Sequence, residues 1–453
     1  MNTTNTSANG RKILFANFPA DGHFNPLTGL AVHLATLGYD VRWYTSSGFA
    51  KKLKQLKIHH YPFKKAIDVS DGDFDKVFPG REKQKTAIGK LKFDIINAFV
   101  LRAPEYYQDI AEVYKSFPFD LLVADCAFTG IPFVKERMHI PVVSIGVLPL
   151  TETSADLPPS GLGIAPSYSL VGKMKQAFLR WFADNIIFKQ PNKVLHQLLQ
   201  EYAIQNGGES IFDMLIQKSD LLLQSGTPGF EYKRQKMSSH IHFIGPLLPF
   251  ASAKQHSQWF DTRINRYKRV VLLTQGTVEK DINKIIVPAL EAFKKTETLV
   301  ICTTGGSQTA KLRNLYPYDN IIIEDFIPFH DVMPYADAYI TNGGYGGVMM
   351  GIENNLPLVV AGIHEGKNEI CARVGYFKLG INLKTEKPLP TQLADAVNEV
   401  ISNPLYKQNV RKLSKEFDAY QPTELCARYI AQLLGTIKPG RANTILKLKT
   451  ALN

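Results

Sequence analysis

The chain opens with a repeating pattern of apolar runs that predicts alternating strands and helices. Residues 12–17 form a short apolar run, typical of a buried strand. Residues 27–38 repeat apolar positions at helical spacing and stop at Gly38, which predicts a helix, and residues 39–45 predict a second strand. A strand–helix–strand unit of this kind places its two strands side by side in a parallel sheet.

The same pattern recurs along the rest of the chain. Further apolar runs predict strands at 119–125, 141–146, 220–225 and 241–248, and then at 270–273, 299–304, 320–326, 337–340 and 356–362. A helix is expected around residues 281–295. With 453 residues, the chain is too long for one ordinary core. We therefore predict an α/β fold with two Rossmann-like domains facing each other. The domains comprise residues 1–248 and 267–453, joined by a linker at 249–266, and the last helix is expected to pack back on the first domain.

In open parallel sheets, ligands bind beyond the carboxyl ends of the strands, so the loops at those ends are the first place to look for chemistry. Four such loops stand out: residues 20–26 (ADGHFNP), the loop beginning at Asp125, residues 274–277 (TQGT) and residues 341–347 (TNGGYGG).

His23 and Asp125 are the candidate catalytic residues. His23 is expected on the loop after the first strand, where an imidazole can face a cleft and act as a general base near neutral pH. Asp125 ends a buried strand, where it can hold the histidine in one tautomer and stabilise its charged form. The residues alone leave a structural histidine and a helix-capping aspartate equally open.

The loop at 341–347 is the candidate anion site. Its glycines let backbone amides approach a ligand closely, and the short helix expected behind it favours negative charge. The alternative is a strained turn without a ligand. Gly276 and Thr277 of the TQGT loop form a second, weaker candidate, and the polar run 364–369 (HEGKNE) suits either sugar hydroxyls or a solvated helix start.

Charge and cysteine content narrow the possible partners. The net charge is +12, but the lysines are dispersed, so we expect no nucleic acid and favour attraction of a small anionic ligand. Four widely spaced cysteines predict neither a zinc site nor a disulfide framework. The polar start of the chain and the absence of a long apolar run predict a cytoplasmic protein without stable membrane insertion.

Taken together, these loops resemble those of family-1 inverting glycosyltransferases of the GT-B fold, of the bacterial macrolide and flavonoid type, over essentially the whole chain. GHFNP is similar to the family's G-H-x-x-P, whose histidine is the catalytic base, here His23. VAD at 123–125 matches the strand whose aspartate completes the dyad. IEDFIPFHDVM resembles the W-x-P-Q stretch whose aromatic ring stacks on the base, with Phe326 in that place.

The resemblance implies a metal-independent enzyme whose co-substrate is a UDP-sugar. The donor-binding residues it implies are Gly276, Thr277, Phe326, Ile327, Asn342, Gly343, Gly344, Tyr345, Gly346, Gly347, Glu365 and Lys367. Several positions depart from the family pattern. Asn342 stands where the family has a diphosphate-binding histidine, Met350 replaces the glutamate that holds the ribose, and Phe329 replaces the glutamine. The sugar-reading D/E-Q pair is absent at its usual register, with Glu365 one residue early.

The expected reaction is transfer of a hexose, by default glucose, to a hydroxyl of a small hydrophobic acceptor. Phe93, Phe128 and Leu148 are the acceptor-binding candidates, under a mobile loop at 148–169, although the aromatic residues suit the core equally well. Two alternatives stay open: a nucleotide-sugar 2-epimerase on the same fold, and a non-catalytic relative that binds a nucleotide sugar.

Overall fold

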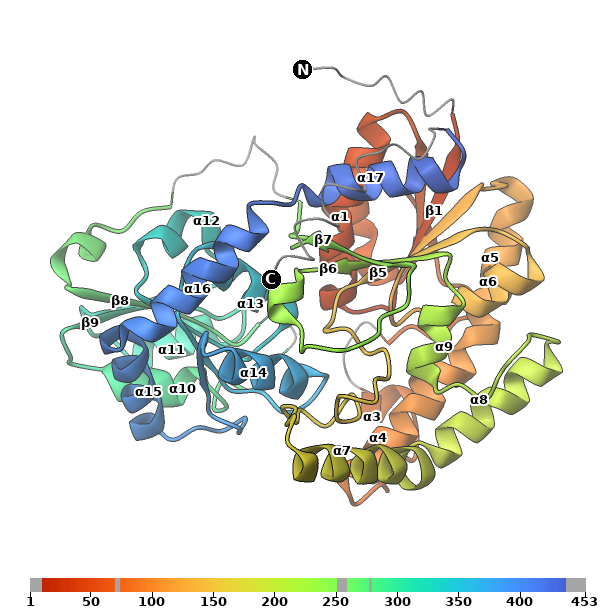
Figure 1. The fold of residues 1–453 in the computed structure, drawn as a ribbon. Coiled ribbons are helices and arrows are strands. Elements are labelled where there is room, and N and C mark those ends of the chain that lie inside the picture. The colour runs from red at the N-terminus through yellow and green to blue at the C-terminus, as the bar shows by residue number, and fades with distance from the viewer. Residues whose placement is uncertain (1–9, 70–73, 251–258, 277–278, 437–453) are drawn as a thin grey trace.

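The computed structural model describes residues 10–69, 74–250, 259–276 and 279–436. Two α/β lobes lie side by side, each built around its own parallel sheet (Figure 1).

The first sheet has the strand order β3-β2-β1-β4-β5-β6-β7, and all its strands are parallel. Its strands are β1 (Lys12–Ala16), β2 (Asp40–Thr45), β3 (His59–Pro62), β4 (Leu121–Asp125), β5 (Val142–Gly146), β6 (Leu221–Ser225) and β7 (Ile241–Gly245). The order reverses between β1 and β4, so the loops that follow these two strands diverge at one point of the sheet edge, where Rossmann-like sheets bind ligands.

Helices cover both faces of this sheet, and the strand periodicity decides which residues face which layer. In β1 and β4 the odd-numbered residues pack in the cluster shared with α1 (Asp21–Thr36), whereas the even-numbered ones pack against α5 (Ala103–Ser116) and α6 (Ile131–Arg137). Because side chains alternate along a strand, Asp125 continues the odd series and points toward α1. The remaining helices of this domain are α2 (Ala50–Gln55), α3 (Phe74–Val77), α4 (Ala87–Asp94), α7 (Leu170–Phe182), α8 (Lys189–Glu201) and α9 (Ile211–Gln217).

The second sheet has the order β10-β9-β8-β11-β12-β13 and is also parallel throughout. Its strands are β8 (Arg269–Thr274), β9 (Thr298–Thr303), β10 (Ile321–Glu324), β11 (Ala338–Thr341), β12 (Leu358–Val360) and β13 (Gly380–Asn382). One face packs on α10 (Ile286–Phe293) and α15 (Pro390–Ser402), and the other on α13 (Tyr345–Glu353), α14 (Lys367–Tyr376) and α16 (Pro404–Phe417). Short helices α11 (Thr309–Leu315) and α12 (Phe329–Val332) complete the domain.

The chain returns to the first domain at its end. Helix α17 (Pro422–Leu433) follows α16 and contacts α1 and β7 (Figure 1). Its residues Cys426, Ala427 and Ile430 are buried in the same cluster as β1 and α1. Of the linker predicted at 249–266, residues 251–258 lie outside the described part of the chain.

Two predicted boundaries are wrong. The first helix begins at Asp21, so His23 lies in its first turn and not on a loop. Gly22 and Pro26 look like loop residues, but Pro26 falls early in the helix and removes only the backbone bond to the Gly22 carbonyl. Helix α10 is shorter than predicted at both ends: it begins at Ile286, and it ends at Phe293 before Lys295, which takes a left-handed conformation. Within the described residues, no helix is long and apolar enough to cross a membrane.

Candidate active site

His23 and Asp125 lie together at the carboxyl edge of the first sheet. The imidazole Nδ1 of His23 is 2.6 Å from Asp125 Oδ1. Asp125 is fully buried, and its carboxylate also accepts the backbone N–H groups of Phe18 at 2.6 Å and Ala127 at 2.8 Å. These bonds offset the cost of burying a charge and fix the carboxylate in one orientation.

The contact with Asp125 determines which ring nitrogen of His23 can accept a proton. A carboxylate only accepts hydrogen bonds, so Nδ1 of His23 carries the proton and donates it to Asp125. Nε2 then keeps its lone pair. The side chain of His23 is 15% exposed, so the ring is not sealed in the core. A neutral imidazole held in this tautomer can remove a proton from a hydroxyl at Nε2.

The three acceptor-binding candidates differ in how deeply they are buried. Phe128 is fully buried in the core, where its ring lies 4.7 Å from that of Tyr106 (centroid to centroid), so it does not line a site. Phe93 is half-buried against the cluster that contains Phe18. Leu148 is half-buried, and its carbonyl accepts a bond from Gln224 Nε2 at 2.7 Å.

Phe18 contacts the imidazole of the dyad, and it was not among the acceptor-binding candidates. The ring of Phe18 meets that of His23 edge-on at 5.5 Å and stacks on that of Phe99 at 4.5 Å. Phe18 follows β1 directly, so its position at a strand end was the signal that could have identified it. Phe93 and Phe99 are half-buried against the same small cluster as Phe18, so the three rings form an apolar wall, of which Phe18 contacts the imidazole.

The glycine loop of the second domain is built around close backbone contacts. Gly343 has φ +78°, and a Cβ there would lie 2.3 Å from Cys371 Sγ. Burial raises the pKa of the Cys371 thiol to about 12, so a neutral sulfur fills this space. Gly344 caps α13, which leaves the first amides of that helix pointing out of its N-terminus. The geometry matches an anion site at a helix N-terminus.

Asn342 ties this loop to the other glycine loop. Its Nδ2 donates to the carbonyl of Gln275, and its Oδ1 accepts from Gly344 N at 3.2 Å. Gly276 has φ +81°, and a Cβ there would lie 2.9 Å from Asn342 Nδ2. Asn342 therefore holds two backbone loops in register. Thr277 lies outside the described residues.

Not all of the other donor-binding candidates face the loop. Tyr345 is buried, and its hydroxyl donates to Ser225 O of the first domain at 2.6 Å, so it joins the domains and does not point at a donor. Burial raises the pKa of this phenol. Ile327 is buried in the core, which leaves only its backbone available. Gly346 and Gly347 belong to the first turn of α13.

Phe326 has the exposure that a base-stacking residue needs. Its side chain follows β10 and is 68% exposed. The ring lies over the loop after β9, within 3.8 Å of a Cβ placed on Gly306. That loop, residues 304–307 (TGGS), reaches the same sheet edge and was missed by sequence reasoning, although its paired glycines after a strand were a usable signal.

Glu365 and Lys367 lie at the start of α14 and form an ion pair with each other. The carboxylate of Glu365 is exposed, whereas the Lys367 side chain is only 15% exposed. The pair lies at the carboxyl edge of the second sheet, after β12, but the two charges neutralise each other there.

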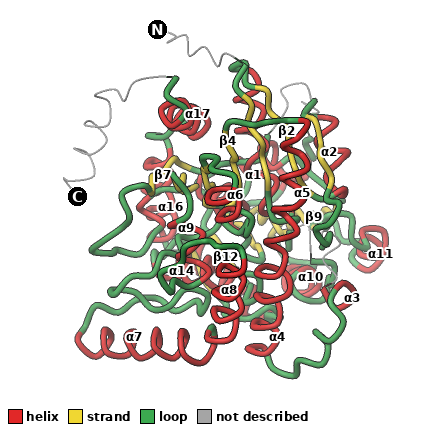
Figure 2. The backbone as a smooth tube through the Cα atoms, turned by 90° about the vertical axis from the view of Figure 1, so that its right-hand side faces the viewer, coloured by secondary structure: helices red, strands yellow, loops and turns green. Residues whose placement is uncertain are grey.

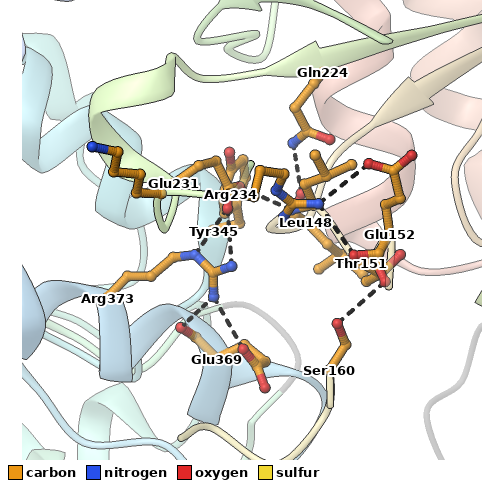
Figure 3. A network of polar contacts seen from close by, with 12 residues as sticks. Leu148, Thr151, Glu152, Ser160, Gln224, Glu231, Arg234, Tyr345, Glu369 and Arg373 are labelled. Carbon is orange, nitrogen blue, oxygen red and sulfur yellow. Dashed lines mark hydrogen bonds and ion pairs between the residues drawn. The ribbon is translucent and has the colours of Figure 1, made fainter. Parts of the chain in front are cut away.

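A buried ionic network between the domains was also missed (Figure 3). The guanidinium of Arg373, 3% exposed, bonds Glu231 Oε2 at 2.9 Å and Glu369 Oε2 at 3.0 Å. Burial alone would lower the pKa of Arg373, but the two carboxylates raise it, so the cation is retained. Glu369 Oε1 also accepts the amides of Gly161 and Gly163 at 2.8 and 2.7 Å, which docks the loop predicted at 148–169 onto α14.

A cavity of about 460 Å³ lies elsewhere, lined in part by Arg266, Tyr267 and Asp319. These residues precede the strands of the second sheet, so the cavity opens at the amino edge, opposite the glycine loops. The ligand-binding edge of such sheets is the carboxyl one, and the cavity is not part of the site.

Similarity to known proteins identifies the family of this chain. Residues 289–432 match the family model described as erythromycin biosynthesis protein CIII-like, C-terminal domain. The chain is 31% identical over 411 residues to 4'-demethylrebeccamycin synthase of Lentzea aerocolonigenes, covering 90% of this chain and 96% of that protein. It is 28% identical to UDP-glucosyltransferase 1 of Beauveria bassiana, with 89% and 91% of the two chains covered. The chain belongs to the family-1 glycosyltransferases of the GT-B fold.

Solved structures agree on the fold of this glycosyltransferase. The calicheamicin glycosyltransferase CalG4 superposes with a TM-score of 0.71 at 22% identity, covering 95% of this chain and 99% of that one. The kitacinnamycin glycosyltransferase gives 0.72 at 17% identity, with 94% and 99% covered. The predicted fold class and enzyme class are confirmed. Met350 and Phe329, which replace polar family residues, both pack against the core of the second domain.

Proposed function

We propose that this glycosyltransferase moves a hexose, by default glucose, from a UDP-sugar to a hydroxyl of a small hydrophobic acceptor, with inversion at the anomeric carbon. The observation that carries the proposal is the 2.6 Å contact between His23 Nδ1 and the buried carboxylate of Asp125. A histidine–aspartate dyad of this kind can deprotonate an acceptor hydroxyl. A non-catalytic relative that only binds a nucleotide sugar would have no use for such a dyad.

In the proposed mechanism, His23 Nε2 takes the proton of the acceptor hydroxyl as its oxygen attacks the anomeric carbon. The bond from that carbon to the diphosphate oxygen breaks on the opposite face, and the nucleoside diphosphate leaves with the electron pair. Asp125 stabilises the imidazolium that forms. A single displacement of this kind inverts the anomeric configuration.

The departing negative charge needs donors already in place. The amides of Gly343 and Gly344 and the N-terminus of α13 supply fixed dipoles at the carboxyl edge of the second sheet. Such preorganised groups stabilise developing charge without reorganising during the reaction. The proposal is that they do so without a metal ion, with Phe326 stacking on the base.

The names of relatives support the substrate classes. Several are called UDP-glucosyltransferases, whereas two solved neighbours hold thymidine diphosphate, so the nucleotide is the finer point to test. Names such as rebeccamycin synthase and calicheamicin glycosyltransferase refer to natural-product acceptors. The apolar wall of Phe18, Phe93 and Phe99 beside His23 suits an acceptor of that kind, with a phenolic, polyketide or terpenoid skeleton.

The test is donor turnover. Purified protein is mixed with UDP-glucose, dTDP-glucose or UDP-N-acetylglucosamine and a pooled panel of phenolic, polyketide and terpenoid acceptors, with EDTA present, and the products are read by mass spectrometry. We expect one acceptor to gain one hexose from UDP-glucose. Conversion of UDP-N-acetylglucosamine with no acceptor present would favour the epimerase, and nucleotide-sugar binding without any product would favour the non-catalytic alternative.

A further inference from the structure

Helix α7 turns its apolar side chains to the solvent. Five large apolar residues of this helix are between 55% and 82% exposed: Leu170, Val171, Met174, Phe178 and Trp181. Amphipathic helices of globular proteins place such residues toward the core. Scattered exposed apolar residues are ordinary, but five on one thirteen-residue helix form a contiguous surface that needs a partner.

The positions of these residues show that the exposed surface is one face of the helix. At about 3.6 residues per turn, Leu170, Met174, Phe178 and Trp181 follow one another along a single stripe. The rings of Phe178 and Trp181 stack at 6.0 Å. We refer to these four residues and Val171 as the α7 apolar face.

The opposite side of α7 is held to the protein by polar bonds. Gln176 is 3% exposed, its Nε2 donates to the Asp156 carbonyl at 2.9 Å, and its Oε1 accepts from Ser167 N at 2.5 Å. Gly172 is the other buried residue of the helix. Phe182, at the end of the helix, packs against the core of the first domain. The side of α7 that carries Gln176 is therefore anchored to the protein, and the apolar face is left toward the solvent.

Two lysines flank the α7 apolar face. Lys173 and Lys175 are exposed, and at helical spacing they project to opposite sides of the stripe. A helix with an apolar face bordered by lysines and carrying Trp and Phe is the pattern of segments that lie in a bilayer interface. The net charge of +12 adds attraction to an anionic surface.

The place of α7 in the molecule leaves room for a flat surface. The helix runs along the end of the molecule opposite α17 in both views (Figures 1 and 2). A second copy of the chain is a poorer occupant, because pairing two such faces would bring the flanking lysines of both copies together.

We propose that the α7 apolar face docks the enzyme peripherally on an anionic lipid bilayer. Leu170, Met174, Phe178 and Trp181 enter the interface, and Lys173 and Lys175 meet the headgroups. The helix lies parallel to the surface and does not span the bilayer. This inference goes beyond the proposed reaction and does not depend on it.

The test is vesicle flotation of the full chain with two kinds of vesicle, one of phosphatidylcholine alone and one of equal parts phosphatidylcholine and phosphatidylglycerol. We expect flotation with the anionic vesicles and a blue shift of tryptophan emission, because Trp181 is the most exposed of the three tryptophans. The double variant Met174→Gln/Phe178→Gln should lose about tenfold or more in partitioning for each side chain. Lys173→Gln/Lys175→Gln should lose about thirtyfold, since each lysine near an anionic surface contributes about fivefold.

Matched control variants distinguish binding through the α7 apolar face from non-specific binding to vesicles. Leu315→Gln/Leu389→Gln removes two exposed apolar residues of the second domain, and Lys412→Gln/Lys415→Gln removes two exposed lysines of α16. Both variants should float like the parent chain. Binding that ignores anionic lipid, binding that survives both α7 variants, or a dimer in solution that the Met174→Gln/Phe178→Gln variant abolishes would each overturn the proposal.

Discussion

The two sheet edges that make up the candidate site differ in the groups they present: side chains on the first domain and backbone on the second. On the first domain, the proposed chemistry resides in two side chains, with His23 held by a carboxylate that itself accepts two backbone amides. On the second domain it resides in the backbone, where glycines keep space open and Asn342 fastens two loops together.

The difference teaches that the two halves should respond to different kinds of substitution. The first edge depends on which functional group is present, so an isosteric change of chemistry should damage it. The second edge depends on the space that its glycines leave free. A methyl group added by a Gly→Ala change should therefore damage this edge where the space is filled by a neighbour and be harmless where it is open.

The largest effect is expected at His23. His23→Ala removes the proposed base, and loss of a positioned base removes about 10²–10⁴-fold in rate. Nucleotide binding should stay close to normal, because the imidazole lies on the other domain from the glycine loops. Steady-state kinetics and calorimetric titration with UDP measure the two quantities.

Asp125→Asn sharpens this result. Residues that act as a unit give strongly non-additive losses. The double variant His23→Ala/Asp125→Asn should therefore be about as slow as His23→Ala alone. Near-normal turnover in His23→Ala, or losses that multiply in the double variant, would rule out the dyad as a catalytic unit.

The first edge was more readable from sequence than the second. Side chains alternate between the two faces of strand β4, so the direction of Asp125 toward the helix after β1 follows from periodicity. The residues alone left the role of His23 open, and the similarity to the family's G-H-x-x-P motif supported it. Tyr345 and Phe128 also follow strands, yet both are buried in packing that no local pattern specifies.

Contacts between the domains were beyond the reach of local patterns altogether. Arg373 and Glu231 are 142 positions apart, and each looks like an ordinary surface charge in its own segment. Only the placement of one domain against the other makes them a buried pair. Amphipathic helices of globular proteins usually turn such an apolar stripe toward the core, whereas the structure places the stripe of α7 outside.

Breaking the network that holds the two edges together should have the next largest effect. Arg373→Met leaves the buried carboxylate of Glu231 and the half-buried one of Glu369 without their cation, which costs about 3–5 kcal/mol in the free energy of unfolding. Urea denaturation measures it. Adding Glu231→Gln to Arg373→Met should recover part of the loss, because one of the uncompensated buried charges is then removed. A loss below about 1 kcal/mol would mean that the network does not join the domains energetically.

The smallest effects separate space from chemistry on the second edge. Gly343→Ala places a Cβ 2.3 Å from Cys371 Sγ at a backbone φ of +78°, so donor binding should weaken and stability should fall by about 1–3 kcal/mol. Gly346→Ala is the matched control, because a Cβ there meets no atom within 4 Å and lies in the first turn of α13. Alanine favours helix over glycine, so Gly346→Ala should hold or raise stability by up to about 1 kcal/mol. Thermal unfolding and UDP titration of both variants give the answer. Intact stability with weakened UDP binding in Gly346→Ala would show that the donor itself occupies the space beside this residue. The glycines of the second edge would then be needed for contact with the ligand as well as for internal packing.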